Sequence, residues 1–156
     1  MTRRRRLAVL VATGSVAVGT LAGCASTVSL QAAPDANDPL CAQITAYLPS
    51  TLDGQARRWT DAQATGAWGD PASIIVSCGV TPPGASTLPC QTVDGVDWLI
   101  DDSEAPYYRF TTFGRTPAVE VYLDYDVVSS FDTLDALAPL VGKLPVDAAC
   151  TDRPDS

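Results

Sequence analysis

The fold is decided by the stretch YYRFTTFGRTPAVEVYLDY, residues 107–125, in which apolar and polar side chains alternate on both sides of a turn. Alternation with a period of two is typical of a half-buried strand, and the glycine and proline in 114–117 mark the turn. The pattern therefore predicts an antiparallel hairpin with one strand over 107–113 and the other over 118–125.

Folding this hairpin about its turn places Phe110 opposite Val121 and Tyr108 opposite Leu123, which gives one apolar face. The other face carries Arg109, Thr111, Glu120 and Tyr122. The arginine and the glutamate of this second face lie diagonally across from each other, which predicts an ion pair of small energetic weight at the surface.

Two further strands are expected before the hairpin, over 72–80 and 92–100, where apolar residues again alternate. A proline-rich segment, 82–89, separates them. The stretch 53–70 is polar and shows no such alternation, so we expect a long loop there.

Helices are expected at both ends of this strand region. Asp38 is a good N-cap with Pro39 in the first helical position, and Pro49 ends that helix. Ser129 caps a second helix, in which Pro139 predicts a kink or a split into two short pieces. The order of helix, four strands and helix predicts an α+β fold, a four-stranded antiparallel sheet with two helices packed on one face.

The N-terminus has the features of a bacterial lipoprotein signal. Residues 3–6 are all arginine, and the uncharged apolar stretch 7–21 follows. Fifteen residues of helix reach about 22 Å, short of a hydrocarbon core of ~30 Å, which favours a cleaved signal over a membrane-spanning helix. The segment ends Leu-Ala-Gly-Cys at 21–24 and looks like a lipobox, which implies cleavage before Cys24 and acyl chains of the palmitate type on that residue. An ordinary secretory signal is the alternative.

These features predict a lipoprotein on the extracytoplasmic side of the cell membrane. The expected organisation is a signal peptide over 1–23, a lipidated cysteine and flexible tether over 24–37, one domain over 38–150 and a disordered tail over 151–156. Removing the signal takes away four arginines and no acidic residue, which leaves six basic and eighteen acidic side chains and a net charge of −12.

Four cysteines remain for the folded domain: Cys41, Cys78, Cys90 and Cys150. An even number in an exported chain predicts two disulfides, and three connectivities are possible. We favour the pairing of Cys41 with Cys78 and of Cys90 with Cys150, because the first two lie on faces predicted to be buried. The short CxxC pairs of a zinc site are absent.

Missing residue types exclude several functions. The chain has no histidine, so Ser-His-Asp and Cys-His catalysis and histidine metal ligands are excluded. Lys143 is the only lysine, which excludes a polybasic surface for nucleic acid. Acidic groups such as those in 101–104 and 124–126 could hold Ca²⁺ or serve a glycosidase, but they lack a calcium-loop spacing. We therefore expect no catalytic residue, no metal and no cofactor.

Aromatic and cationic side chains are the candidates for contact with a partner, because tryptophan and arginine are typical anchors of binding surfaces. The candidates are Arg57, Arg58, Trp59, Trp68 and Arg115. The alternative for the two tryptophans is a loop that folds back over the sheet, and for the last arginine a solvated turn. Trp98 lies on an apolar strand face and is expected in the core.

Five motifs occur in order along the chain: GAWGDP (66–71), SCGV (77–80), VDGVDW (93–98), TFGR (112–115) and VEV (119–121). Together they resemble the actinobacterial domain-of-unknown-function family 3515, whose members are secreted or lipid-anchored. Members often carry arginine before the cysteine of the second motif, where this chain has Ser77. The resemblance implies a location and a domain type, and it brings no activity and no catalytic residue.

The expected function is that of a lipid-anchored cell-envelope protein without enzymatic activity, which serves binding or assembly. Its expected partners are the membrane, through Cys24, and an envelope protein or glycan. Two alternatives stay open: a small envelope hydrolase that uses Asp or Glu, and a solute-binding accessory lipoprotein, which would need a pocket.

Overall fold

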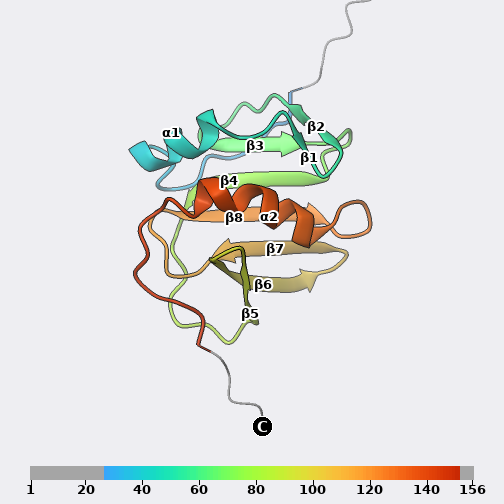
Figure 1. Cartoon of the computed structure of the whole chain (residues 1–156). Helices are drawn as coiled ribbons and strands as arrows, with labels where there is room; N and C mark the ends of the chain where they lie inside the picture. Colours follow the sequence, from blue (N-terminus) through green and yellow to red (C-terminus); the bar gives the residue numbers. More distant parts are fainter. Residues whose placement is uncertain (1–26, 152–156) are drawn as a thin grey trace, which may run out of the picture.

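The computed structural model describes residues 27–151, so Cys24 and the predicted signal peptide lie outside the described residues. The described chain forms one antiparallel sheet with two helices (Figure 1). In chain order the elements are α1 (Pro39–Ala46), β1 (Thr51–Leu52), β2 (Gln55–Arg58), β3 (Thr65–Trp68), β4 (Ile74–Val80), β5 (Cys90–Val93), β6 (Val96–Glu104), β7 (Tyr107–Thr112), β8 (Ala118–Asp124) and α2 (Ser130–Val141).

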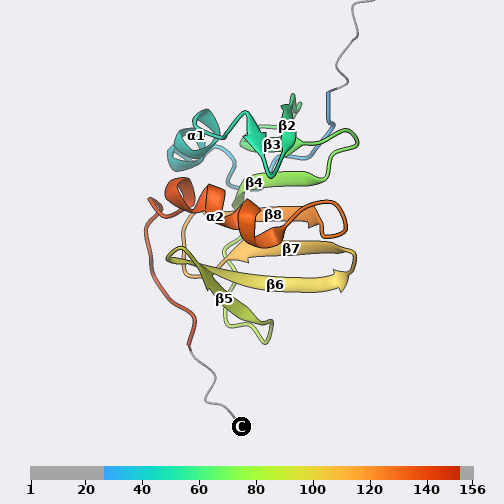
Figure 2. The same ribbon diagram turned by 45° about the vertical axis from the view of Figure 1, so that its right-hand side comes forward.

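The strands lie in the order β1-β2-β3-β4-β8-β7-β6-β5. Each half of the sheet is a meander in which consecutive strands pair, and the two halves meet where β4 pairs with β8. All of these pairings are antiparallel. The two meanders therefore make one continuous sheet, whose short outermost strands are β1 and β5 (Figures 1 and 2).

The prediction of a four-stranded sheet is wrong, because the sheet has eight strands. Strands β2 and β3 lie inside the polar stretch 53–70, where the sequence predicts a loop, and β1 directly precedes it. The expected strand over 92–100 is divided between β5 and β6. In both places an Asp-Gly pair in the sequence marks a tight turn between two strands. Asp53-Gly54 and Asp94-Gly95 have the same φ angles, 43° and 74°, as type I′ hairpin turns require.

The hairpin of β7 and β8 has the predicted register. Phe110 pairs with Val121 and Tyr108 with Leu123. The predicted ion pair on the opposite face is also present, with the Arg109 guanidinium 3.0 Å from the carboxylate of Glu120. Local alternation of apolar and polar residues was therefore sufficient to fix which side of this hairpin is buried.

The core lies between the sheet and the two helices. Ile74, Val76 and Cys78 alternate along β4 and are buried, and Cys41 and Ile44 of α1 belong to the same cluster. Four buried residues of α2 complete it, Leu134, Leu137, Ala138 and Val141, and Thr133 of this helix is also buried. Figure 1 shows α2 lying across the sheet on this side. No helix among residues 27–151 is long and apolar enough to cross a membrane.

Both predicted helix starts are confirmed. The Asp38 side chain accepts a hydrogen bond from the Leu40 amide, and the Ser129 hydroxyl accepts one from the Asp132 amide. The second helix is not split, since Pro139 lies inside a single helix of 12 residues. The proline is the third residue from the end of this helix, so the one backbone hydrogen bond that it removes belongs to the last turns, and the helix continues past it.

Two disulfides join distant parts of the chain in the favoured pairing. Cys41 of α1 is bonded to Cys78 of β4, and Cys90 of β5 is bonded to Cys150 near the C-terminus. They close loops with sequence separations of 37 and 60 residues. Constraining loops of this size in the unfolded chain contributes about 4 kcal/mol of stability for each bond in the chain-entropy account.

The packed part of the chain begins before Asp38, inside the segment that composition predicts as a tether. The Val28 amide donates to the Trp59 carbonyl at 2.8 Å, and the Asp35 amide donates to the Gly79 carbonyl at 2.9 Å. Ala36 is buried in the core cluster. Gly79 has a φ of 88°, and a Cβ at this position would meet the backbone of Asp35.

Gly79→Ala should destabilise the protein by more than the cost of a positive φ alone, because of this close approach. We expect the free energy of unfolding to fall by about 2–5 kcal/mol, from a left-handed alanine together with the displaced backbone. Gly95→Ala is the matched control, because Gly95 also has a positive φ, and nothing lies within 4 Å of an added Cβ. Its expected cost is about 1–2 kcal/mol. Equal losses in denaturant unfolding would contradict the close packing of Asp35 and Ala36 against β4.

Candidate functional site

Trp68, one of the candidate contact residues, is a core residue. Its exposed fraction is 0%, and its indole N–H donates to the Pro49 carbonyl at 3.0 Å. The Arg57 guanidinium lies 5.9 Å from the centre of the indole ring and covers it. Trp68 is therefore not available as a surface contact. Trp98 is also fully buried, as its strand position predicts.

Arg115 is buried too, although it follows the glycine of a hairpin turn. Its exposed fraction is 5%. The guanidinium donates to the carbonyls of Leu144 at 2.8 Å, Gly95 at 3.1 Å and Gly142 at 3.3 Å. Gly142 and Leu144 follow the last turn of α2, where free carbonyls and the helix dipole favour a cation. Arg115 therefore joins two turns to the end of a helix, and it is not available to a partner.

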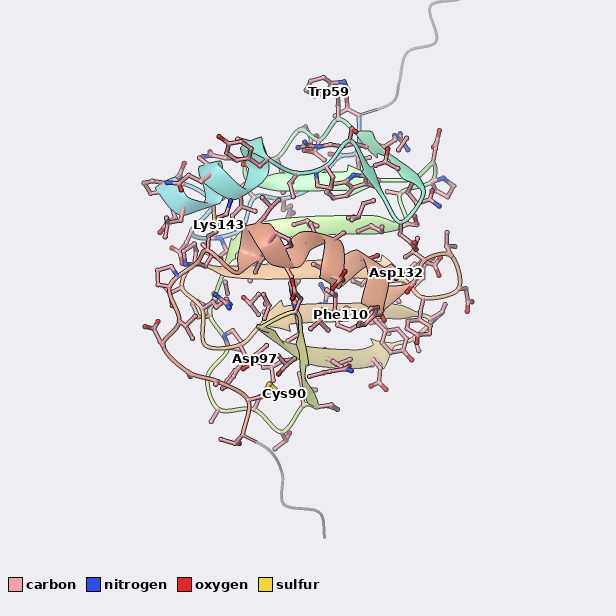
Figure 3. The ribbon with its side chains drawn as sticks, in the orientation of Figure 1. Trp59, Cys90, Asp97, Phe110, Asp132 and Lys143 are labelled. Carbon is pink, nitrogen blue, oxygen red and sulfur yellow. A yellow bond between two sulfur atoms is a disulfide. The ribbon has the colours of Figure 1, made fainter. Side chains whose placement is uncertain are left out.

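The other three candidates remain at the surface, in what we call the Trp59 corner: Arg57, Arg58, Trp59 and Thr60. Trp59 is 79% exposed and projects from one extremity of the molecule (Figure 3). Arg58 pairs with Asp70 at 2.8 Å. The Arg57 guanidinium donates to the Leu48 carbonyl at 3.0 Å. The two arginines are thus held in place on either side of the strand that ends before Trp59.

The N-terminal end of the described chain is attached to this corner. Val28 forms a parallel bridge with Thr60. The Asp61 carboxylate accepts hydrogen bonds from the Leu30 amide and the Ser29 hydroxyl, both at 2.8 Å. These two bonds, the Leu30 amide first, hold the pKa of Asp61 below its usual value, so the carboxylate is charged at neutral pH.

A second cluster lies on the side of the sheet that the helices leave uncovered. We call this surface the open face, and its central residues are Glu104, Tyr107, Arg109, Glu120 and Tyr122. The rings of Tyr107 and Tyr122 are stacked, with centroids 5.6 Å apart, and the Arg109 guanidinium lies 4.7 Å from the centre of the Tyr122 ring. Tyr107 is 41% exposed.

Two carboxylates complete the cluster. Glu104 accepts a hydrogen bond from the Tyr122 hydroxyl at 3.0 Å and lies 3.4 Å from Arg109, which also pairs with Glu120. Partial burial lowers the pKa of Arg109, but the two glutamates outweigh it, and the pKa is raised overall. Burial, followed by the hydrogen bond to Glu104, raises the pKa of Tyr122. Arg109 and Tyr122 therefore keep their positive and neutral forms at physiological pH.

The open face continues toward the end of the sheet at β5. Leu99 and Phe113 line a broad hollow of about 730 Å³ there, beside the disulfide of Cys90 and Cys150. Apart from Leu88 and Pro89, the rest of its lining is polar: Ser86, Thr87, Gln91, Thr92 and Thr151. Its volume is in the range of small-molecule sites, but it contains no charged side chain to orient a ligand.

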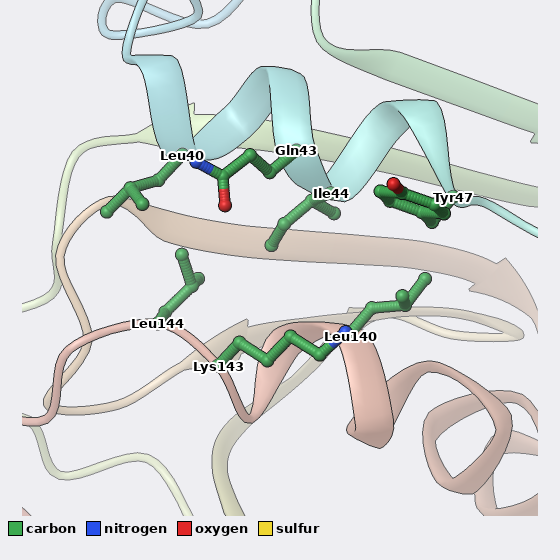
Figure 4. Close-up of a pocket in the computed structure, with 7 residues that line it drawn as sticks. All are labelled: Leu40, Gln43, Ile44, Tyr47, Leu140, Lys143 and Leu144. Carbon is green, nitrogen blue, oxygen red and sulfur yellow. The ribbon is translucent and has the colours of Figure 1, made fainter.

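A smaller groove lies between the two helices on the other side (Figure 4). Leu40 and Ile44 of α1, with Tyr47 just after this helix, face Leu140 and Leu144 across it, with Gln43 and Lys143 at its rim. Its volume of about 70 Å³ holds a few water molecules and is too small for a drug-sized ligand.

The acidic groups considered as metal or catalytic candidates shape turns. The Asp124 carboxylate accepts from the Asp126 amide at 3.1 Å, and the Asp101 carboxylate accepts from the Ser103 amide at 3.0 Å. The hydrogen bonds from Ser103 lower the pKa of Asp101. Within residues 27–151, no group of three or more potential ligands is arranged to hold a metal ion.

The Trp59 corner contains three of the contact candidates predicted from the sequence, whereas the open face contains none of them. Tyr107, Tyr122 and Glu104 were not among the contact candidates, although the register placed Tyr122 beside Arg109 on the polar side of the hairpin. The sequence signal for this surface is a pair of tyrosines, Tyr107 and Tyr122, on the side of the hairpin that faces solvent. A side that only contacts water needs no aromatic residues.

The fold and these surfaces define a small α+β protein with two disulfides and a one-sided sheet that presents aromatic and charged residues. The chain belongs to the family described as "Protein of unknown function (DUF3515)", which it matches over residues 6–148. Neither the curated proteins nor the solved structures contain a match to the chain.

Substitution of Arg115 should destabilise the fold more than substitution of a surface arginine with similar bonds. In Arg115→Lys, one ammonium cannot reach three carbonyls that water cannot solvate, and we expect a loss of about 2–3 kcal/mol in the free energy of unfolding. Arg57→Lys is the control, because Arg57 also donates to two carbonyls but is exposed, and its expected loss is under about 1 kcal/mol. Denaturant titration measures both, and similar losses would show that Arg115 is solvated.

Proposed function

We propose that this chain is a lipid-anchored binding module on the extracytoplasmic side of the membrane, without enzymatic activity. The lipobox at 21–24 supports the anchor, and two disulfides support an oxidising location. The signal peptide and Cys24 lie outside the described residues. The binding surface proposed from the structure is the open face, in place of the set that included Trp68 and Arg115.

The observation that carries this proposal is the stack of Tyr107, Tyr122 and Arg109 on the uncovered side of the sheet. Tyrosine and arginine are enriched at binding hot spots because they offer a large contact area and directed hydrogen bonds. Glu104 and Glu120 fix the guanidinium in its place before any partner arrives. Little side-chain entropy is then lost on binding, which favours affinity.

The partner proposed for this surface is an envelope protein with a basic surface. The exported chain would carry a net charge of −12, and an acidic body of this kind attracts a positively charged partner over a Debye length. The hollow beside Leu99 and Phe113 adds an apolar area at the edge of the same face. The open face thus combines polar side chains with an adjoining apolar area, and protein–protein interfaces contain both.

Cys24→Ala should release the chain from the membrane. Without the thiol there is no site for the diacylglycerol, and no helix of the described residues can span the bilayer in its place. The measurement is fractionation of cells that express the tagged full chain, followed by mass determination of the membrane-bound form. Cys24→Ala protein that stays with the membrane in high salt, or wild-type protein of unacylated mass, would contradict the lipid anchor.

Tyr107→Ser should weaken partner binding at least about tenfold, the loss expected for an exposed aromatic in a hot spot. Phe131→Ser is the matched control, because Phe131 is an exposed aromatic on α2, outside the open face. The experiment is crosslinking in intact cells with the lipidated chain, read by mass spectrometry and followed by titration of the captured protein. Equal effects of the two variants would reject the open face, and recovery of a glycan in place of a protein would reject the proposed partner class.

A further inference from the structure

The Trp59 corner lies very close to the proposed lipid anchor. Val28 is hydrogen-bonded to Trp59 and bridged to Thr60, and only four residue steps separate Val28 from Cys24. At 3.3–3.6 Å for each residue, these steps span at most about 14 Å. A lipid on Cys24 therefore keeps this corner within about 14 Å of the membrane surface, and this step rests on the proposed function.

The attachment between the N-terminal segment and the corner involves several bonds. The Val28 amide donates to the Trp59 carbonyl, and the Asp61 amide donates back to the Val28 carbonyl at 3.3 Å. The Asp61 carboxylate then holds the Ser29 hydroxyl and the Leu30 amide. The corner cannot move far from residue 28 without breaking these bonds together, so the anchor limits the orientation of the whole domain.

The exposed side chain at this position suits a bilayer surface. Trp59 is 79% exposed, and an indole combines a large apolar ring with one N–H donor, which is why tryptophan is enriched at the level of lipid headgroups. Once the chain is anchored, insertion of the ring is an intramolecular event at millimolar effective concentration. A weak intrinsic preference of the indole for the interface is then sufficient to keep the ring in the headgroup layer.

The charge around Trp59 also permits this corner of the domain to approach the membrane. Arg57 and Arg58 balance Asp61 and Asp70, so the corner is close to neutral, whereas the exported chain would carry −12. Anionic lipids repel an acidic body, and the repulsion is least where basic side chains are concentrated. Among the described residues these two arginines are adjacent, and the remaining cations are spread over β7, the turn before β8 and the end of α2.

We propose that Trp59 inserts into the interfacial layer of the bilayer beside the lipid on Cys24, so that the domain stands on the membrane in one orientation. Figure 3 shows Trp59 at one extremity of the molecule and Cys90 toward the other. In this orientation the sheet edge formed by β5 and the disulfide of Cys90 faces away from the membrane.

The test uses the full lipidated chain reconstituted in vesicles of phosphatidylcholine and phosphatidylglycerol, with brominated acyl chains as quenchers of tryptophan emission. Trp68 and Trp98 are fully buried, so quenching by the lipid reports on Trp59. We expect quenching of the wild-type protein and its loss in Trp59→Phe. The matched control adds Phe131→Trp to Trp59→Phe, which places an exposed indole on α2, and this indole should stay unquenched.

The outcomes separate this inference from the proposed function. Lipidated protein whose emission is not quenched, or equal quenching of the indole at position 131, would overturn the seating of Trp59 and leave the lipid anchor intact. Protein that carries no lipid mass would overturn both. Quenching confined to an indole at position 59 supports the proposed orientation.

Discussion

The pairing of β4 with β8 is the contact on which the rest of the structure depends. Without this pairing, β4 and β8 would each be an exposed edge strand, and their apolar residues would lack their neighbours across the junction. Joined through these two strands, the meanders form one sheet, and the apolar residues of both strands meet under the helices. Cys78, on β4, then fixes α1 to the same place through its bond to Cys41.

The helices cover one side of this sheet, and the opposite side holds the candidate binding surface. Arg109, Tyr107 and Tyr122 lie on strands β7 and β8, close to the β4–β8 junction, so the surface rests on the best-supported strands of the molecule. A site on strands holds its side chains more firmly than a site on loops. The Trp59 corner, by contrast, lies at the end of β2, near the edge, where the chain from the N-terminus joins the sheet.

Sequence reasoning was reliable where the structure is local. The hairpin of β7 and β8, both helix caps and the pairing of Arg109 with Glu120 follow from neighbouring residues. Sequence reasoning failed where the structure depends on residues that are distant in the sequence. All four residues of β3 are buried, so they show no alternation, and the strand was missed. Arg115 is in a turn, and its burial depends on the carbonyls that follow α2, 27 or more residues later.

The bond between Cys90 and Cys150 has a consequence that depends on the redox state of the surroundings. It holds the C-terminal segment beside β5, the outermost strand, and the Cys150 amide also donates to the Asp97 carboxylate at 2.7 Å. In a reducing compartment this covalent link cannot persist, and β5, an outermost strand with one unpaired edge, would no longer be tied to the C-terminal segment. Oxidation of Cys90 and Cys150 thus fixes the end of the described chain to the outermost strand, in addition to making the fold more stable.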